Sequence, residues 1–547
     1  MKIEKMKIVN FKCFKGEFSL KLNEGINIIV GNNESGKSTV LEAIHLALTG
    51  LFNGRYLKNE LTQYLFNREV VEEYLDNIAN DKPAPLPYIL IEIYIKENFA
   101  EFEGNGNSER TNACGLSLKI DFDEKYQSEY TQFIENGNIK SLPIEYYEIF
   151  WTTFARDSIT SRSIPIKSAL IDSSSYRYQN GSDIYISRII RDNLETNEII
   201  RISQAHRAMR DNFMDCEVIK QINDKIATEA EISNKTIELS VELLSKNAWE
   251  SSLITYVDKI PFHFVGKGEQ CIIKTKLALT HKRTIEANFI LLEEPENHLT
   301  HSRLNHLIYD IKRNIENKQI IITTHSSFVA NKLGLDNLVL LNRTTTTRFD
   351  ELPDDTKSFF EKIAGYDTLR LILCNKAILV EGPSDELIIQ KAYMNKNNGV
   401  LPIENEIDVI SVGTSFLRFL EIAEKCQKPV VVVTDNDGDI EALNDKYKNY
   451  LGDNAKDFIK ICFDENIDTG DLESEEEAFN YNTLEPKLAN ANNLKVLNEI
   501  FNTCFDNKDD LHRYMNKNKT KCALEIFNTD KDIIFPNYIM EAIRDNE

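Results

Sequence analysis

Residues 31–39, GNNESGKST, have the residue types and spacing of a loop that binds nucleotide phosphates. An apolar run at 26–30 precedes them and a helical pattern at 39–48 follows, which is the strand–loop–helix context that this motif requires. Backbone N–H groups of such a loop converge on phosphate oxygens, and the following helix adds its positive end. A glycine-rich turn before a helix is the alternative, and the matched context disfavours it. The residues expected to bind ATP are Gly31, Asn32, Asn33, Gly36, Lys37, Ser38 and Thr39, with Lys37 on the β- and γ-phosphates and Ser38 on Mg²⁺.

Two carboxylates follow a later apolar run, FILL, in an arrangement typical of the acidic half of an ATP site. Ligands of open α/β sheets bind at the carboxyl ends of the strands, so these side chains would face the nucleotide. We expect Glu293 to approach Mg²⁺ through a water molecule and Glu294 to polarise the attacking water.

Two further features would complete an ATP site. The strand-like run QIIITT ends at His325, which is expected to sense the γ-phosphate; a single His at a strand end is otherwise structural. Gly266 and Gly268 open a helical segment and suit a phosphate contact, although a simple capped helix gives the same pattern.

Acidic side chains also follow two apolar runs in the last third of the chain. The run KAILV ends in Glu381, with Asp385 one helical turn later, and the run PVVVVT ends in Asp435 and Asp437. Carboxylates at neighbouring strand ends repel one another unless cations lie between them, and oxygen-only ligands favour Mg²⁺ or Mn²⁺ over zinc. A solvated acidic turn is the alternative. An EF-hand is excluded, because Lys446 stands where the twelfth loop residue should be Glu.

The composition is that of a globular protein with an acidic surface. The 547 residues carry a net charge of −23, which argues against a general nucleic-acid coat but leaves room for a local DNA-binding patch. No apolar run approaches the ~18 residues that a membrane span needs, and the N-terminal residues alternate like a strand rather than a signal peptide. The 9 cysteines form no C-x-x-C pair. These features predict a cytoplasmic protein with reduced thiols and no membrane partner.

Four segments must position these groups. We expect the first part of an ATPase domain at 1–155, a helical insertion at 156–255, the second part of the ATPase domain at 256–350, and a separate α/β domain at 370–547. The insertion has either the plain role of extra helices or the role of an arm for dimerisation or DNA contact, and the sequence does not decide between them.

The ATP-site residues together resemble the ABC-type ATPase heads of chromosome-maintenance and RecF-like repair proteins. That resemblance implies a dimer in which the loop at Gly266 and Gly268 caps the nucleotide of the other subunit. The pattern from Glu381 to Asp437 resembles a Toprim domain. With Glu-Glu-Pro-Glu-Asn-His-Leu at 293–299, Thr-Leu-Glu at 483–485 and Lys-x-x-x-Ala-Leu at 519–524, the whole chain resembles OLD-family nucleases.

The resemblance implies the fold class and further site residues. The fold is an α/β ABC-type head with a helical insertion, followed by a Rossmann-like Toprim domain. Two-metal DNA cleavage would use Glu381, Asp385 and Asp435 for one cation, and Asp437 with Glu485 for the second. Lys519 would stabilise the transition-state charge, although Lys517 and Lys521 flank it.

The predicted function is therefore that of an ATP-regulated, Mg²⁺- or Mn²⁺-dependent DNA endonuclease. By resemblance, it acts in bacterial anti-phage defence as a homodimer or larger homo-oligomer, alone or with a helicase or retron nucleic acid. The alternative is a DNA-sensing or DNA-repair ATPase of the RecF or SMC type, whose Toprim domain binds DNA without cleaving it.

Overall fold

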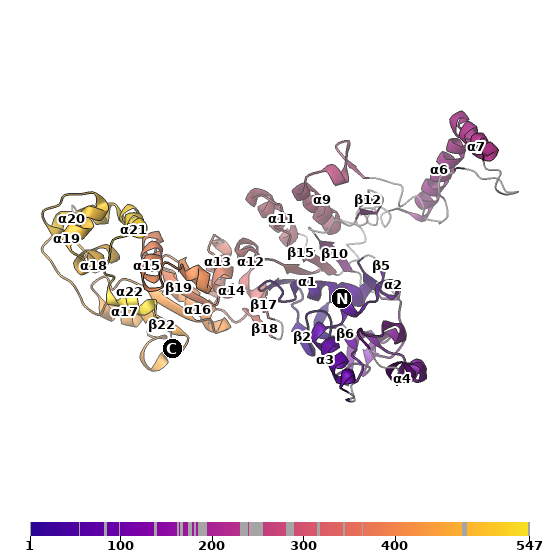
Figure 1. Ribbon diagram of the computed structural model, residues 1–547, viewed down its shortest axis with the longest axis horizontal. Helices are drawn as coiled ribbons and strands as arrows, with labels where there is room; N and C mark the ends of the chain where they lie inside the picture. Colours follow the sequence, from indigo (N-terminus) through magenta and orange to yellow (C-terminus); the bar gives the residue numbers. More distant parts are fainter. Residues whose placement is uncertain are drawn as a thin grey trace. The chain divides into compact units, whose positions relative to one another are not determined.

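The chain folds into two compact units, Met1–Thr324 with Leu341–Thr346, and His325–Leu340 with Thr347–Glu547 (Figure 1). Both combine helices with β-sheets. The computed structural model describes residues 2–53, 55–80, 82, 85–97, 99–135, 139–160, 163–164, 168–172, 178–179, 182–183, 194–229, 239, 255–280, 289–313, 318–342, 345–363, 365–472 and 479–544.

The first unit contains an antiparallel sheet with the strand order β2-β1-β6-β8-β7. β7 pairs with the first residues of β8, and β9 pairs with residues 116–122 of the same strand. Alternation of buried and exposed residues along β2 shows that one face covers a core, as expected for an antiparallel sheet. The strands are β1 (Ile3–Val9), β2 (Glu17–Lys21), β6 (Ile89–Ile95), β7 (Glu103–Gly104), β8 (Ala113–Phe122) and β9 (Tyr147–Thr153).

The same unit contains the parallel strands that carry the predicted nucleotide residues. β10 (Ser168–Asp172), β15 (Phe289–Glu293), β16 (Gln319–Thr323) and β3 (Ile26–Val30) lie side by side in this order, and each neighbouring pair is parallel. All residues of β3 and β16 are buried, which explains their continuous apolar sequence. Helix α1 (Lys37–Thr49) follows β3 directly after the loop, so the predicted strand–loop–helix order is confirmed.

The remaining described elements of the first unit include those of the predicted insertion. Most of 156–255 lies outside the described residues. Its two long described helices, α6 and α7, keep apolar side chains such as Ile200, Met209 and Val218 exposed. The elements are β4 (Leu51–Phe52), β5 (Arg55–Tyr56), α2 (Leu57–Glu60), α3 (Arg68–Ala79), α4 (Gln127–Glu135), β11 (Tyr178–Gln179), β12 (Ser182–Asp183), α6 (Thr196–Asp215), α7 (Glu217–Glu229), β13 (Tyr256–Val257), β14 (Ile260–Pro261), α9 (Lys267–Thr280) and α11 (His301–Arg313).

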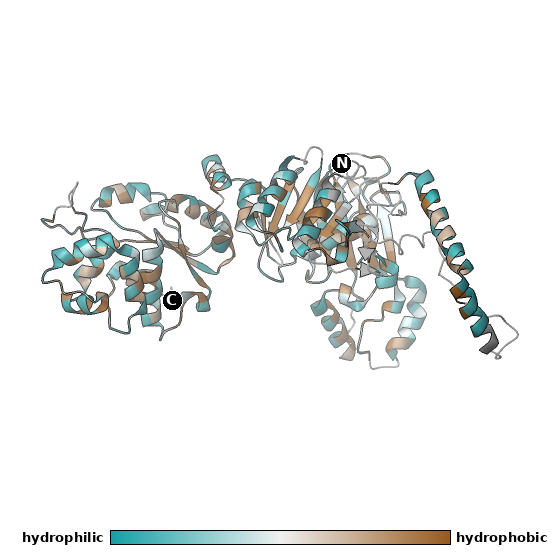
Figure 2. Ribbon diagram, turned by 90° about the horizontal axis from the view of Figure 1, so that it is seen from above, coloured by the Kyte–Doolittle hydropathy of each residue, from teal (hydrophilic) through white to brown (hydrophobic). Residues whose placement is uncertain are grey.

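The second unit is built on a four-stranded parallel sheet with the order β20-β19-β21-β22. Figure 2 shows these strands as mainly apolar, between helices with more polar outer faces. The strands are β19 (Lys376–Val380), β20 (Ile407–Ser411), β21 (Val430–Val433) and β22 (Ile459–Cys462). The other elements are α12 (Ser327–Leu333), α13 (Asp354–Lys362), α14 (Thr368–Leu373), α15 (Pro383–Lys396), α16 (Phe416–Cys426), α17 (Ile440–Lys446), α18 (Leu484–Ala491), α19 (Leu494–Phe501), α20 (Lys508–Lys517), α21 (Lys519–Asn528) and α22 (Asn537–Ala542). Strands β17 (Leu338–Leu341) and β18 (Thr346–Arg348) each contain residues of both units.

None of the helices in the described ranges is both long enough and apolar enough to cross a membrane.

An aromatic cluster joins α13 to α16 in the second unit. The ring of Phe360 is fully buried, with its centroid 5.2 Å from that of Phe419 and 6.1 Å from that of Tyr366. Residues before the predicted boundary at 370 therefore contribute to the core of this unit.

We predict that Phe360→Ala lowers the free energy of unfolding of the second unit by about 3–5 kcal/mol, because the substitution leaves a cavity within the cluster. Chemical denaturation of the full chain, followed by circular dichroism, measures this change. Ile363→Ala is the matched control, because Ile363 is 50% exposed at the end of the same helix and its loss is expected to change stability by less than about 0.5 kcal/mol. Equal effects of the two substitutions would contradict the prediction.

Candidate functional site

Two glycines of the 31–39 loop are required by its geometry. Gly36 has a φ of 103°, a conformation that residues with a side chain rarely adopt. A Cβ on Gly31 would lie 2.5 Å from the Leu341 carbonyl oxygen and 2.6 Å from Ser35 Oγ. Asn32, Asn33 and Ser38 remain exposed, so the outer surface of the loop is open to a ligand.

Lys37 is buried beneath this loop. Its Nζ donates hydrogen bonds to the carbonyl oxygens of Gly31, at 2.9 Å, and Asn32, at 3.1 Å. Burial lowers the pKa of Lys37, while the nearby carboxylates of Glu294, Glu293 and Glu296 oppose that shift. The loop lysine and the predicted acidic residues therefore belong to one electrostatic cluster.

The parallel register of β15, β16 and β3 creates this cluster. Glu293 is paired with Thr323, which is paired in turn with Ile29, so the carboxyl ends of the three strands meet at one edge. The Glu294 N–H donates to the Thr323 carbonyl oxygen at 2.9 Å, and its Oε2 accepts from Asn297 at 2.8 Å. These bonds hold Glu294 in a backbone conformation with a φ of 41°.

Two more residues lie next to this edge: Glu296, which the sequence analysis did not predict as a site residue, and His325, which it did. Glu296, whose Oε1 accepts a 2.6 Å hydrogen bond from Thr324, joins the Lys37 cluster although only Glu293 and Glu294 were expected there. His325 is exposed directly after Thr324, where the second unit begins. Its contact with a γ-phosphate stays a prediction.

The two glycines at the start of α9 have different surroundings. A Cβ on Gly268 would lie 2.3 Å from the His298 carbonyl oxygen, whereas a Cβ on Gly266 would meet no atom within 4 Å. Packing against the loop after β15 therefore explains Gly268 within this chain, and a phosphate contact of either glycine stays a prediction.

The predicted carboxylates of the second unit gather at one edge of its sheet. Glu381 directly follows β19, and Asp435 follows β21 after a single residue. Because β19 and β21 are adjacent and parallel, their carboxyl ends lie side by side. Asp385 stands in the first turn of α15, where its Oδ2 accepts a 2.9 Å hydrogen bond from the Gly382 N–H.

The charges of these carboxylates are strongly coupled. Burial raises the pKa of Asp385 to about 6, and Glu485 and Glu381 add to this shift. Both Asp385 and Asp435 keep part of their surface in solvent, and Glu381 is exposed. The pKa of Asp435 is raised to about 8 by burial and by the surrounding carboxylates of Asp385, Glu381, Asp437 and Glu485.

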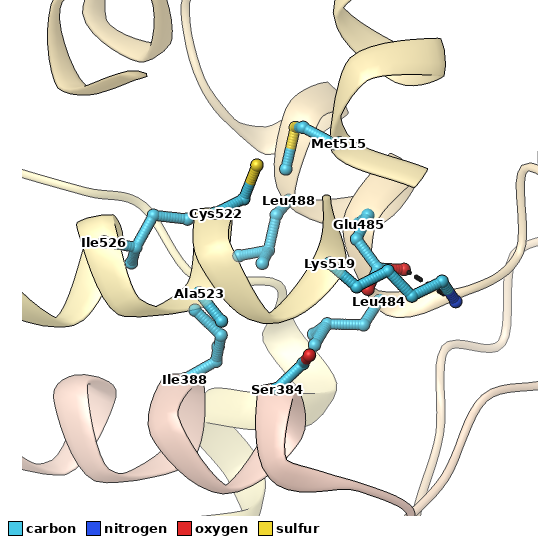
Figure 3. A pocket seen from close by; sticks show the side chains of 10 residues that line it. All are labelled: Ser384, Ile388, Leu484, Glu485, Leu488, Met515, Lys519, Cys522, Ala523 and Ile526. Atoms are coloured by element: carbon cyan, nitrogen blue, oxygen red, sulfur yellow. Dashed lines mark ion pairs between the residues drawn. The ribbon is translucent and has the colours of Figure 1, made fainter. Parts of the chain in front are cut away.

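The last two predicted ligands and the predicted lysine come from loops and helices around this edge. Asp437 is exposed, and its Oδ1 accepts a 3.0 Å hydrogen bond from Asn480. Glu485 is 5% exposed on α18, and its Oε2 lies 3.3 Å from Lys519 Nζ at the start of α21 (Figure 3). The structure thus selects Lys519, rather than its two flanking lysines, as the cation beside Glu485.

These side chains fit divalent metal ions in their chemistry. All are oxygen donors, as Mg²⁺ and Mn²⁺ prefer, and the buried Glu485 Oε2 receives no hydrogen bond from any described residue. Within the described ranges, no three His, Cys, Asp or Glu side chains converge on a single point. The carboxylates of Asp385, Asp437 and Glu485 contact Gly382, Asn480 and Lys519 respectively, and a metal ion would compete with these partners.

A buried tyrosine lies beside the carboxylates, and no sequence motif indicated it. Tyr538 on α22 is 5% exposed. Burial raises the pKa of its hydroxyl group, and the charges of Asp435, Asp385, Asp464 and Glu485 raise it further. Only the packing of α22 on β21 and β22 brings this residue to the site.

Two known protein families match this chain, one over the part with the nucleotide loop and one over part of the region with the carboxylates. Residues 5–259 match the family described as AAA domain, and residues 372–437 match the family described as Overcoming lysogenization defect protein-like, TOPRIM domain. The chain joins an AAA-type ATPase domain to an OLD-like Toprim domain. The predicted fold class and the resemblance to OLD-family proteins are confirmed, because the two matched families are those of an ATPase domain and an OLD-like Toprim domain.

Individual relatives share either the whole arrangement or a short part of it. Endonuclease GajA of Bacillus cereus (strain HuB5-5) is 23% identical over 546 residues, covering 82% of this chain and 76% of that protein. The DNA replication and repair protein RecF of Clostridium tetani is 30% identical over 82 residues, covering 15% of this chain and 22% of RecF. The DNA double-strand break repair Rad50 ATPase of Pyrococcus abyssi is 43% identical over 58 residues, covering 11% of this chain and 6% of Rad50. Among solved structures, the SMC head domain from Thermotoga maritima matches with 13% identity and a TM-score of 0.28, covering 64% of this chain and 99% of that one.

We predict that Gly268→Ala lowers the free energy of unfolding by about 1–3 kcal/mol, because its Cβ forces the loop after β15 to move. The matched control, Gly266→Ala, is expected to change stability by less than about 0.5 kcal/mol. Thermal unfolding of both variants tests this difference. If the two substitutions had the same effect on stability, the packing explanation for Gly268 would be wrong.

Proposed function

We propose that this ATPase–Toprim chain is an ATP-regulated, divalent-metal-dependent DNA endonuclease. The observation that carries the proposal is the set of five carboxylates near the carboxyl ends of β19 and β21, whose charges act on Asp435, with Lys519 beside Glu485, in an OLD-like Toprim domain. The similarity to a protein named Endonuclease GajA over most of both chains supports it.

In the proposed mechanism, Glu381, Asp385 and Asp435 hold one Mg²⁺ or Mn²⁺ ion, and Asp437 with Glu485 holds a second. Bound there, the metal ions would supply a water of lowered pKa and stabilise the leaving oxygen. The part-exposed Lys519 can turn from Glu485 toward a DNA phosphate, where its charge stabilises the transition state.

The ATPase unit would regulate this reaction rather than take part in it. Lys37, with Ser38 and the rest of the 31–39 loop, binds ATP and Mg²⁺, while Glu293 and Glu294 complete the site from the neighbouring strand ends. Gly266 and Gly268 would cap the nucleotide of a second copy, and His325 would contact the γ-phosphate.

Several wider properties belong to the same proposal. The chain acts on DNA in the bacterial cytoplasm as a homodimer or larger homo-oligomer, joined through its ATPase unit and the helical insertion. It serves anti-phage defence, alone or with a helicase or retron nucleic acid. The alternative function is that of a DNA-repair ATPase whose Toprim domain only binds DNA. The short matches to the repair proteins RecF and Rad50 are the reason to consider it.

We predict that Glu381→Gln and Asp435→Asn each reduce cleavage by at least about 100-fold, because loss of even indirect metal contacts costs about 10–100-fold. The assay follows nicking and linearisation of a plasmid with Mg²⁺ or Mn²⁺, with and without ATP. Asp445→Asn is the matched control, since Asp445 is an exposed acid on α17 outside the cluster. Cleavage at the wild-type rate by both site variants would contradict the nuclease function, and DNA binding without any cleavage by the wild type would favour the alternative.

We further predict that Lys37→Ala abolishes ATP hydrolysis and removes the ATP dependence of cleavage, because the substitution removes the ammonium group that lies against the phosphate loop, bonded to the Gly31 and Asn32 carbonyl oxygens. Phosphate release and plasmid cleavage, measured on the same preparation, separate the two effects. Lys58→Ala removes an exposed lysine of the same unit and is expected to change neither. An unaltered response of Lys37→Ala to ATP would contradict the proposed regulation.

A further inference from the structure

A lysine is buried on the helix that carries Glu485. The side chain of Lys487 is only 4% exposed, and its Nζ lies 3.0 Å from Asp464 Oδ2 and 3.2 Å from Asp468 Oδ2. The same Nζ donates a 2.8 Å hydrogen bond to the Asn466 carbonyl oxygen. An ammonium group is tolerated in a protein interior when it is paired and hydrogen-bonded. These three acceptors match its three N–H groups.

Lys487 contacts loop 464–468. The same loop accepts hydrogen bonds from Asn436, the residue between the predicted metal ligands Asp435 and Asp437. Asn436, 3% exposed, stands between Asp435 and Asp437 in the sequence. Its Nδ2 donates to the carbonyl oxygens of Asp464, at 2.5 Å, and Asn466, at 3.0 Å. The Asn466 carbonyl oxygen therefore receives both the Lys487 ammonium and the Asn436 amide.

A second path leads from the same loop to Asp437. The Asp468 N–H donates to Asn482 Oδ1 at 2.7 Å, and Asn482 Nδ2 donates back to the Asp468 carbonyl oxygen at 2.9 Å. Asn482 is linked through its N–H to Asn480 Oδ1, and Asn480 donates to Asp437 Oδ1 at 3.0 Å. Both predicted ligands after β21 are thus tied to loop 464–468.

We propose that Lys487 is a positioning residue of the metal site: a fixed internal cation that orders loop 464–468 and thereby sets the positions of Asp435 and Asp437. Its single charge offsets half of the negative charge that Asp464 and Asp468 add next to an already acidic edge. The inference rests on the proposed function for the identity of the site, but its test measures metal binding directly.

The test titrates the full-length chain with Mn²⁺ and records binding by calorimetry, together with the Mn²⁺ concentration for half-maximal plasmid cleavage. Lys487→Met removes the charge and keeps a side chain of similar length. We expect it to weaken Mn²⁺ binding and to raise the half-maximal concentration by about 10–100-fold, with the rate at saturating Mn²⁺ within about threefold of the wild type. Lys495→Met, which removes an exposed lysine of α19, is the matched control and should leave both quantities unchanged.

Asn436→Ala provides a second variant, which removes the bonds from Asn436 to the loop but none of the groups that Lys487 itself contacts. It should weaken Mn²⁺ binding similarly, and the double variant should be no weaker than either single one, because both act through the same loop. A folded Lys487→Met chain with wild-type Mn²⁺ affinity would overturn the inference. If Lys487→Met fails to fold, wild-type affinity in Asn436→Ala overturns it equally.

The outcome for the wild type separates the two proposals. If the wild type binds Mn²⁺ but does not cleave DNA, the proposed nuclease function fails and the inference is decided by the binding data alone. If the wild type binds no Mn²⁺, both are wrong.

Discussion

Electrostatic repulsion between carboxylates at one edge of a parallel sheet is the constraint on which the second unit depends. The adjacent strands β19 and β21 deliver Glu381 and Asp435 to the same edge, and burial together with the neighbouring carboxylates raises the pKa of Asp435. Hydrogen-bond donors and a cation reduce this repulsion: the Gly382 N–H, Asn480 and Lys519 each contact one of the carboxylates. Lys487 pairs with Asp464 in the adjacent loop. Divalent metal ions at this edge would complete the neutralisation.

In the first unit, adjacent parallel strands also bring charged residues to one edge of a sheet, but there the charges are of opposite sign. Its parallel strands bring the buried Lys37 close to Glu293, Glu294 and Glu296. The lysine is already bonded to the loop carbonyl oxygens, so a bound triphosphate has to draw it away from protein acceptors. Each unit therefore has a charged site formed at strand ends, which explains how one chain can combine nucleotide binding with a metal site.

The sequence indicated those parts of the sites that are encoded locally. An apolar run followed at once by glycines or carboxylates predicts a strand and the residues at its end, so the positions of the 31–39 loop, Glu293, Glu294, Glu381 and Asp435 at strand ends were predicted without the fold. Tyr538, Lys487 and Asn436 were not, because their importance arises from packing between distant segments. Gly268 was assigned to phosphate binding, while its contact with His298 is visible only in three dimensions. The domain boundaries and the individual site roles stay predictions.

The most direct test of this account is a crystal structure of the full chain with Mn²⁺, in which anomalous scattering locates the metal ions. The account predicts anomalous peaks about 2.0–2.3 Å from carboxylate oxygens of Asp435 and Glu381, since this is the distance range for oxygen ligands of such ions. Strong peaks elsewhere in the chain with none at Asp435, or carboxylates of Glu381 and Asp435 that do not share an ion, would contradict it.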